Sequence, residues 1–305
     1  ICVVTGARSE YGLFLPIMKK IQSSDYLELQ IVATTMHFSE EFGNTYKKIE
    51  EDGFFINEKI ENLLSLDSKS SIAKSTGLAI ILLSDAFSHI EPDVVLLLGD
   101  RFETHAAATT AMLMNIPIAH IHGGEITEGA VDEQIRHSIT KMSYLHFCST
   151  EVYRNRIIQM GEDPLMVFNT GAPGIDNIVN FELLSKDVLE EQLKWKFPIK
   201  CALFTYHPVT LVNDDLKRDL SIIFDVLPGS DIGVLFTYAN ADNGGRIINK
   251  KIEEFCKLAP TKYKVVKNLG QLRYLSAMKH VDFIIGNTSS GIIEAGSFSK
   301  PVVNI

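Results

Sequence analysis

The sequence has few cysteines, no long apolar run and no excess of basic residues. Its four cysteines, Cys2, Cys148, Cys201 and Cys256, lie far apart and form no Cys-x-x-Cys pair, which disfavours both a disulfide framework and a cysteine zinc site. No apolar run approaches the ~18 residues that a membrane-spanning helix needs, and no secretory signal is visible. We therefore expect a cytoplasmic protein with no membrane association.

The charge balance excludes one class of partner. The chain has 29 basic and 38 acidic residues, a formal net charge of −9, whereas sequence-independent binding to nucleic acid relies on clustered Lys and Arg. A small anionic ligand held by a few local groups is compatible with this charge. The 305 residues are 46% hydrophobic and suffice for two ordinary domains. The sequence begins without Met inside "ICVVTG" and ends inside "PVVNI", so we expect both ends to be trimmed.

Short apolar runs alternate with stretches of helical spacing along the whole chain. This alternation predicts an α/β protein with parallel sheets covered by helices on both faces. One sheet holding all the strands would be unusually large, so we expect two doubly wound domains, residues 1–178 and 179–305, around a cleft. The runs that we read as strands are "ICVVT", "LQIVA", "DVVLLLG", "IPIAHI", "LHFCS", "MVFNT", "CALFTY", "IGVLFTY", "YKVVK", "VDFIIGN" and "PVVNI".

Two junctions in the first domain place charged groups where a strand ends. In "VVTGARSEYG", Arg8 begins a helix, where its guanidinium and the backbone amides could hold an anion, or where an ordinary turn joins strand and helix. In "VVLLLGDRFE", Asp100 and Arg101 follow a strand. Asp100 is either a base whose pKa is raised by burial or the N-cap of the next helix.

The stretch "AHIHGGEITEGAVDEQIRHSITK" carries most of the candidate chemistry. His120 and His122 are two residues apart at the end of a strand; we expect them to point to opposite faces, with no shared metal and one core histidine. Glu125 follows in the loop. Asp132 and Arg136 are four residues apart at a helix start and share a face. They form either a surface ion pair or a ligand-facing carboxylate that Arg136 orients.

Polar residues also follow the strands of the second domain. His207 ends "FTYH", and Asn240 lies in "TYANADNGG". In "VDFIIGNTSSGIIEAG" three hydroxyls and the amides of a helix start converge where a phosphate would bind, and a Ser-rich cap explains one or two of them but hardly three. Glu294, one turn into this helix, is placed to accept hydrogen bonds from a vicinal diol such as a ribose. The polar residues before it are Asn287, Thr288, Ser289 and Ser290.

With these motifs the sequence resembles the UDP-N-acetylglucosamine 2-epimerase family, and within it the hydrolysing enzymes that begin sialic acid biosynthesis. The combination of GGE…D-x-x-IRH-x-I-x-K with GN-x-SSG…E is far more specific than any single junction. The likeness implies a GT-B fold, two Rossmann-like domains around a nucleotide cleft, with no metal or other cofactor and a homodimer or homotetramer. It rests on "TGARSEYG", "EEFGNTYKKIEEDGF", "LLLGDRFE", "HIHGGEITEGAVDEQIRHSITK", "HPVT", "NADNGG" and "IIGNTSSGIIEAGSFSKPVVNI".

The resemblance implies a reaction in two steps. A base removes the C2 proton of UDP-GlcNAc while UDP leaves, giving 2-acetamidoglucal; water then adds at C1 with protonation at C2, releasing N-acetylmannosamine. The alternatives are the same reaction on a UDP-diacetamido-trideoxyhexose of a legionaminic-type pathway, a non-hydrolysing epimerase, and a GT-B glycosyltransferase. A sugar-nucleotide-binding protein without turnover is the non-enzymatic alternative.

The resemblance also implies roles for individual residues. Asp100 and Asp132 match carboxylates of the proton transfers, and Arg136 lies beside Asp132. His122 stands where many relatives carry a Glu that is one of the proposed acid/base groups, and a histidine can exchange a proton near neutral pH. The family also continues after "PVVNI" into an arginine-bearing loop that this chain lacks. The catalytic candidates are Asp100, Asp132, His122, Arg136 and Glu125; the substrate or UDP-binding candidates are Arg8 and His207 at the diphosphate, Thr288 and Ser289 as hydroxyl ligands, Glu294 at the ribose, and Arg101, Asn240, Asn287 and Ser290.

Overall fold

All of the expected strands are present in the computed structural model, which describes residues 1–64, 68–127, 131–207, 215–239 and 245–305. The chain divides into two compact units, Ile1–Pro173 and Gly174–Ile305, and each contains one parallel sheet. The boundary expected after residue 178 falls within helix α7 (Pro173–Asn180). No helix of the described residues is both long enough and apolar enough to span a membrane.

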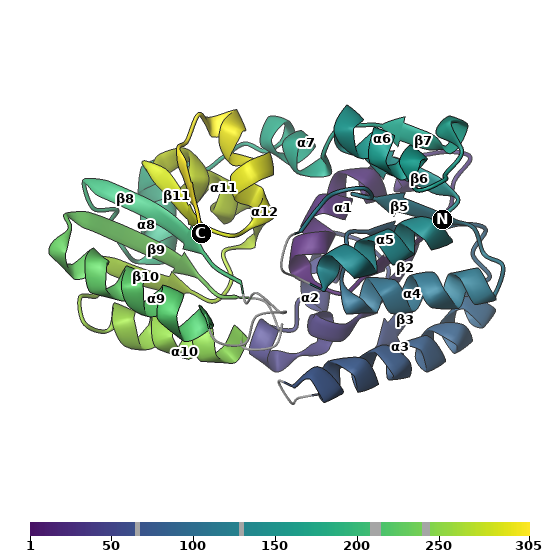
Figure 1. The fold of residues 1–305 in the computed structure, drawn as a ribbon, viewed down its shortest axis with the longest axis horizontal. Helices are drawn as coiled ribbons and strands as arrows, with labels where there is room; N and C mark the ends of the chain where they lie inside the picture. Colours follow the sequence, from purple (N-terminus) through teal and green to yellow (C-terminus); the bar gives the residue numbers. More distant parts are fainter. Residues whose placement is uncertain (65–67, 128–130, 208–214, 240–244) are drawn as a thin grey trace. The chain divides into compact units, whose positions relative to one another are not determined.

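The first unit is a parallel sheet of seven strands in the order β3-β2-β1-β4-β5-β6-β7 (Figure 1). This order reverses direction between β1 and β4, which is where doubly wound sheets bind ligands at the carboxyl ends of their strands. The strands are β1 (Cys2–Thr5), β2 (Gln30–Thr34), β3 (Glu58–Ile60), β4 (Val95–Leu98), β5 (Ile118–Ile121), β6 (Leu145–Cys148) and β7 (Val167–Asn169). The helices are α1 (Arg8–Gln22), α2 (Tyr46–Glu51), α3 (Lys69–Ile90), α4 (Phe102–Leu113), α5 (Asp132–Met142) and α6 (Glu151–Gln159).

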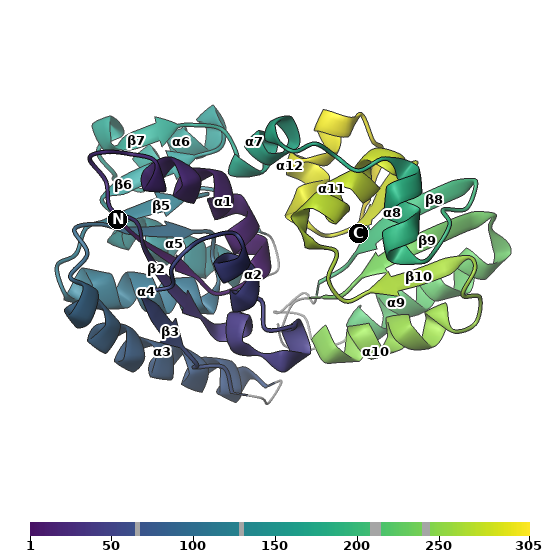
Figure 2. The same ribbon diagram turned by 180° about the vertical axis from the view of Figure 1, so that it is seen from behind.

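Two apolar cores cover the two faces of this sheet because successive strand residues point to opposite sides. Val4 and Leu97 face the core that includes Phe87 and other residues of α3, α4 and α5. Val3 and Leu96 face the core formed with α1 and α2. Figure 1 shows α3, α4 and α5 on the near face, and Figure 2 shows α1 on the opposite face. The sheet therefore holds the ends of β4, β5 and β6 in a fixed, fully packed frame.

The second unit repeats this architecture on a smaller scale, with a parallel sheet in the order β10-β9-β8-β11-β12. Its central strand β8 lies between β9 and β11, so the sheet again reverses direction beside its first strand. The strands are β8 (Lys200–Thr205), β9 (Ile232–Thr237), β10 (Tyr263–Val266), β11 (Phe283–Gly286) and β12 (Val302–Asn304). The helices after α7 are α8 (Lys186–Leu193), α9 (Asp215–Val226), α10 (Gly245–Cys256), α11 (Gly270–His280) and α12 (Ser289–Ile293).

Gly286 shows how tightly β11 and β8 approach each other. Its φ is +145°, and a Cβ built on it would lie 1.7 Å from the carbonyl oxygen of Thr205. Only glycine fits this position, because any side chain would have to displace backbone. The close approach fixes the end of β11 directly before Asn287 and the hydroxyl residues.

Candidate active site

The candidate residues of the first unit meet at the carboxyl ends of three adjacent strands. Asp100 comes shortly after β4, His122 directly follows β5, and Ser149 directly follows β6. β5 pairs in parallel with both β4 and β6. Parallel strands end at the same edge of a sheet, so these side chains are brought together although they are far apart in sequence.

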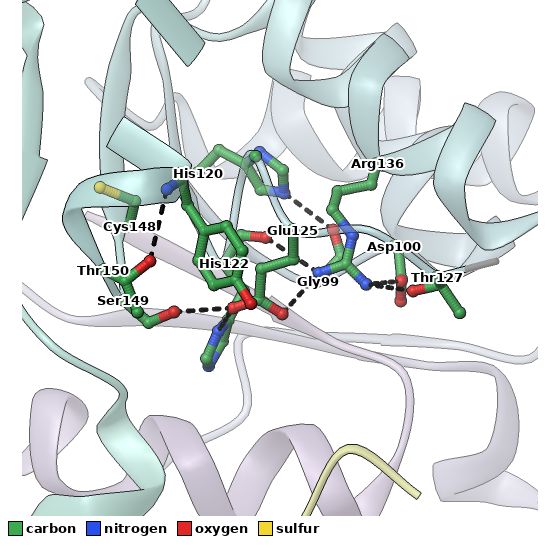
Figure 3. A network of polar contacts seen from close by, with 12 residues as sticks. Gly99, Asp100, His120, His122, Glu125, Thr127, Arg136, Cys148, Ser149 and Thr150 are labelled. Atoms are coloured by element: carbon green, nitrogen blue, oxygen red, sulfur yellow. Dashed lines mark hydrogen bonds and ion pairs between the residues drawn. The ribbon is translucent and has the colours of Figure 1, made fainter. Parts of the chain in front are cut away.

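Arg136 of α5 is the centre of the network that joins them (Figure 3). Its Nη1 donates to Oε2 of Glu125 at 2.8 Å and to the carbonyl oxygen of His122 at 3.0 Å. Its Nη2 donates to Oδ2 of Asp100 and to Oγ1 of Thr127, the latter at 3.1 Å. Only 6% of Arg136 is exposed, so its charge is compensated inside the protein by two carboxylates.

The expected pairing of Arg136 with Asp132 is wrong. Within the described residues, the hydrogen bonds of this guanidinium go to the backbone of His122 and to the side chains of Glu125, Asp100 and Thr127. The physical reason is tertiary packing: the side chains of Glu125 and Asp100 reach the buried guanidinium from the loops that follow β5 and β4, whereas Asp132 is the first residue of α5.

Glu125 accepts hydrogen bonds from three side chains. Its Oε1 accepts hydrogen bonds from Nδ1 of His122 at 2.6 Å and from Oγ of Ser149 at 2.9 Å. Its Oε2 accepts a hydrogen bond from Arg136. Burial would raise the pKa of Glu125, but the contacts with His122, Arg136 and Ser149 together hold it below its ordinary value. Glu125 is therefore an ionised carboxylate at neutral pH.

Asp100 has the opposite pKa shift. Burial raises the pKa of its carboxyl above the ordinary value, although Arg136 and Arg101 oppose the shift and Glu125 adds to it. A carboxylate with a raised pKa next to an arginine that also binds a second carboxylate is a candidate proton-transfer group. The structure thus gives two carboxylates of one network different proton affinities.

His120 is the expected core histidine. The expected reason, opposite faces of one strand, is wrong: residues two apart on a strand share a face, and His122 differs because it lies beyond β5 with a φ of +65°. It is fully buried, with Nε2 2.8 Å from the carbonyl oxygen of Gly99 and Nδ1 3.3 Å from Oγ1 of Thr140. Burial lowers the pKa of His120 to about 3, so its imidazole is neutral. Among the described residues, no group of three or more His, Cys, Asp or Glu side chains could hold a metal ion.

The backbone between His122 and Glu125 is unusual. His122 has a φ of +65°, which is uncommon for a residue with a side chain and occurs mainly at functional sites and turns. Gly124 has a φ of +78°, and a Cβ there would lie 2.6 Å from the carbonyl oxygen of Tyr153. Arg156 of α6 donates to the carbonyl oxygen of Gly124. This loop is held tightly, and it turns the chain so that His122 meets Glu125.

After β1, the backbone amides that could hold an anionic ligand donate instead to a carboxylate of the protein. Oε2 of Glu10 accepts from the backbone amides of Gly6 and Ala7 at 2.8 and 3.2 Å. For these two amides the structure favours an ordinary turn between strand and helix over an anion site. The contact of Arg8 with a diphosphate stays a prediction. Burial and the charge of Glu103 raise the pKa of Glu10 to about 8.

Arg101 lies against the same pair of acidic residues. Its Nε is 2.6 Å from Oε1 of Glu103 and 3.9 Å from Oε1 of Glu10. Glu103 is almost fully buried, so the ion pair anchors Arg101 within the first unit. A nucleotide contact by Arg101 stays a prediction.

In the second unit, Asn287 links two loops. Its Oδ1 accepts from the backbone amide of His207 and its Nδ2 donates to the carbonyl oxygen of His207, both at 2.8 Å. The Asn287 side chain thus bridges the segments that follow β8 and β11, and its contact with a ligand stays a prediction. Asn240, the candidate after β9, lies outside the described residues.

The hydroxyl residues after Asn287 form a short chain. Oγ of Ser290 is 3.4 Å from Oγ1 of Thr288 and also contacts the phenol of Tyr274, while Ser289 begins α12. Glu294 follows α12 and is 8% exposed. Burial raises the pKa of Glu294 from 4.5 to about 7. No hydrogen bond from a described residue stabilises its charged form, so it is a buried carboxyl available to a ligand.

Two residues of the first network were missed by sequence reasoning. Ser149 and Thr127 bind Glu125 and Arg136, respectively. Ser149 had a usable signal, because it directly follows the apolar strand "LHFC" beside the strand that ends at His122. Thr127 had none, since its place depends on the path of the loop after Gly124.

The chain is similar over its whole length to proteins of one enzyme family. The family profile described as UDP-N-acetylglucosamine 2-epimerase matches residues 19–305. A GDP/UDP-N,N'-diacetylbacillosamine 2-epimerase (hydrolyzing) of Campylobacter jejuni is 43% identical over 100% of this chain and 79% of its own. A UDP-N,N'-diacetylbacillosamine 2-epimerase (hydrolyzing) of Legionella pneumophila is 37% identical over 100% and 80%. A UDP-N-acetylglucosamine 2-epimerase of Neisseria meningitidis is 30% identical over 100% and 79%.

Solved structures share the fold. The UDP-GlcNAc 2-epimerase of Methanocaldococcus jannaschii in complex with UDP-GlcNAc and UDP has a TM-score of 0.80 at 19% identity, covering 99% of this chain and 83% of its own. That of Neisseria meningitidis bound to UDP-GlcNAc has a TM-score of 0.78 at 20% identity, covering 99% and 81%. The predicted fold of two Rossmann-like domains of the GT-B type is confirmed. The chain belongs to the UDP-N-acetylglucosamine 2-epimerase family and, within it, to the hydrolysing type.

Proposed function

We propose that the protein cleaves a UDP-linked 2-acetamido sugar with water and releases UDP and the free sugar inverted at C2. The observation that carries this proposal is the buried guanidinium of Arg136, which joins Asp100 to Glu125, with His122 bound to Glu125. Inversion at C2 requires that a proton leaves one face of the sugar and another arrives on the opposite face. The network supplies two separate groups for this exchange, Asp100 and His122.

In the first step, the C2–H bond breaks and its electron pair forms the C1=C2 double bond. The C1–O bond breaks at the same time, and UDP leaves with that electron pair. In the second step, water adds its hydroxyl at C1 and C2 receives a proton. Asp100 and His122 exchange the protons, and Arg136 keeps Asp100 in place. Asp132, at the start of α5, remains a third candidate from the resemblance.

The second unit supplies the UDP site in this proposal. Glu294 accepts hydrogen bonds from the ribose diol, and this contact compensates for the burial of its carboxyl. The hydroxyls of Thr288, Ser289 and Ser290 donate to the diphosphate, together with His207. The bridge from Asn287 to the backbone of His207 keeps these two segments together.

For the sugar we propose a UDP-linked 2,4-diacetamido-2,4,6-trideoxyhexose of the diacetylbacillosamine type. The support is that the relatives of 43% and 37% identity carry this substrate in their names, whereas a relative named for UDP-GlcNAc is 30% identical. UDP-GlcNAc, the substrate that the sequence resemblance implied, is the second candidate. A place in sialic acid biosynthesis, a cytoplasmic location and a homo-oligomeric state stay predictions.

The test is to incubate the purified protein separately with UDP-N,N'-diacetylbacillosamine, its GDP analogue and UDP-GlcNAc. We expect UDP and the free 2-epimer in equal amounts, with the highest kcat/KM for UDP-N,N'-diacetylbacillosamine. A UDP-linked 2-epimer without released UDP would identify a non-hydrolysing epimerase instead. Release of UDP only when a sugar acceptor is added would identify a glycosyltransferase, and tight UDP binding without turnover a binding protein.

A further inference from the structure

Both oxygens of the Glu125 carboxylate accept hydrogen bonds. Oε1 lies 2.6 Å from Nδ1 of His122 and 2.9 Å from Oγ of Ser149, and Oε2 lies 2.8 Å from Nη1 of Arg136. An ionised carboxylate can only accept hydrogen bonds, so each of these neighbours must donate. Glu125 therefore determines which protons its neighbours carry.

For His122 the consequence is a defined tautomer. Its Nδ1 must carry a proton to donate to Glu125, and in the neutral imidazole this leaves the lone pair on Nε2. Within the described part of the chain, Nε2 of His122 has no hydrogen-bond partner, and Figure 3 shows the ring turned with its other nitrogen away from Glu125. Nε2 is free to accept a proton.

His120, two residues earlier, has the opposite tautomer. Its Nε2 lies 2.8 Å from the carbonyl oxygen of Gly99, which cannot donate, so Nε2 carries the proton. His120 is fully buried and neutral, and its Nδ1 is left as the acceptor. The two histidines provide an internal comparison within one strand end.

Ser149 controls how firmly Glu125 holds His122. It binds the same oxygen as His122 and comes from a different strand end, whereas Arg136 binds the other oxygen, so Ser149 and Arg136 together fix the orientation of the carboxylate. Without Ser149, Oε1 would keep only the hydrogen bond from His122, and the carboxylate could rotate while it stays hydrogen-bonded to Arg136. Carboxylate–histidine pairs of this kind orient the imidazole and stabilise the imidazolium that forms when it accepts a proton.

We propose that Glu125 and Ser149 are positioning residues that hold His122 as the Nδ1–H tautomer, so that Nε2 accepts the proton from C2 of the sugar. This inference rests on the proposed function. The C2–H bond breaks, the proton moves to Nε2, the electron pair forms the C1=C2 bond, and UDP leaves from C1. The resulting imidazolium carries its charge beside the carboxylate of Glu125, and solvent later takes the proton.

The first test is ¹⁵N NMR of the histidine rings at neutral pH without substrate, with His122 assigned by comparison with His122→Gln. Protonated and unprotonated ring nitrogens resonate far apart. We expect Nδ1–H for His122 and Nε2–H for His120. An Nε2–H or doubly protonated ring at His122 would overturn the inference, and this readout does not depend on turnover.

Glu125→Gln should reverse the tautomer of His122. The new amide is expected to turn its oxygen to Arg136 and its NH₂ group to His122, which makes Nδ1 an acceptor and puts the proton on Nε2. We expect kcat to fall more than 100-fold with a smaller change in KM. The matched control is Glu50→Gln, which removes an exposed ion pair with Lys59. An unchanged ring state and kcat in Glu125→Gln would overturn the inference.

Ser149→Ala should lower kcat about tenfold, which corresponds to losing one hydrogen bond to a charged group, and Ser149→Thr should restore it. Ser84→Ala, which removes an exposed hydroxyl bound to the carbonyl oxygen of Ile81, is the control. Full activity of Ser149→Ala would overturn the role of Ser149. If the ¹⁵N result holds but wild-type protein turns over no nucleotide sugar, the proposed function fails and not the tautomer.

Discussion

Glu294 links ligand binding to stability, and Glu294→Gln measures both. Its carboxyl is buried without a hydrogen-bond donor among the described residues, and burial raises its pKa from 4.5 to about 7. The folded unit therefore holds this proton more tightly than the unfolded chain does. The stability that the proton confers is complete below pH 4.5 and is lost as pH rises through about 7.

The size of this effect follows from the two pKa values. A difference between 4.5 and about 7 corresponds to about 3 kcal/mol of unfolding free energy lost by pH 8. Gln has nearly the same shape and no charge, so Glu294→Gln should be more stable than wild type by up to about 3 kcal/mol at pH 8 and about equal to it at pH 4. The same substitution should weaken UDP binding at least tenfold, since the ribose loses a charged acceptor.

The single tryptophan of the chain makes the assay specific to the second unit. Trp195 is buried in the same apolar cluster as Ala295, the neighbour of Glu294. Urea unfolding followed by Trp195 fluorescence between pH 4 and 8 therefore reports on the unit that contains Glu294. Glu254→Gln, at an exposed site on α10, is the control and should keep the pH dependence of wild type. Parallel curves for wild type and Glu294→Gln across this range would refute the reasoning.

Three further substitutions test the network and the fold. Arg136→Met leaves two buried carboxylates without their cation and should destabilise the first unit by about 3–5 kcal/mol, measured by circular dichroism during urea unfolding; a loss below about 1 kcal/mol would contradict this. Asp100→Asn should lower kcat at least 100-fold with UDP affinity within about twofold of wild type, measured by kinetics and calorimetry; equal losses in both would indicate a structural role. Gly286→Ala should unfold the second unit because its Cβ would overlap a backbone oxygen, whereas Gly296→Ala has open space and should fold normally by Trp195 fluorescence.

The strand pattern was predictable because burial on both faces makes a parallel strand almost wholly apolar. β3 was not predicted because it lacks such an apolar run. It is an edge strand of three residues, Glu58–Ile60, that pairs with β2 alone, so its sequence carries two charged residues and only one buried apolar side chain. Edge strands need fewer apolar residues, and no periodicity can be read from three positions.

The location of the site was predictable and its internal pairing was not. Asp100 and His122 were found because each follows an apolar strand of a doubly wound sheet. The spacing of Asp132 and Arg136 suggested a pair on one helix face, but the buried guanidinium binds the carboxylates that reach it from the ends of other strands. Which groups those are depends on tertiary packing, and helix spacing does not contain that information.

The most direct test of the mechanism is to run the reaction in deuterated water and examine C2 of the released sugar by NMR. Elimination followed by hydration removes the original C2 proton, so the account predicts one deuterium at C2 of every product molecule, together with one UDP. Released UDP with a sugar that retains hydrogen at C2 would contradict the account, because it would mean hydrolysis without proton transfer at that carbon.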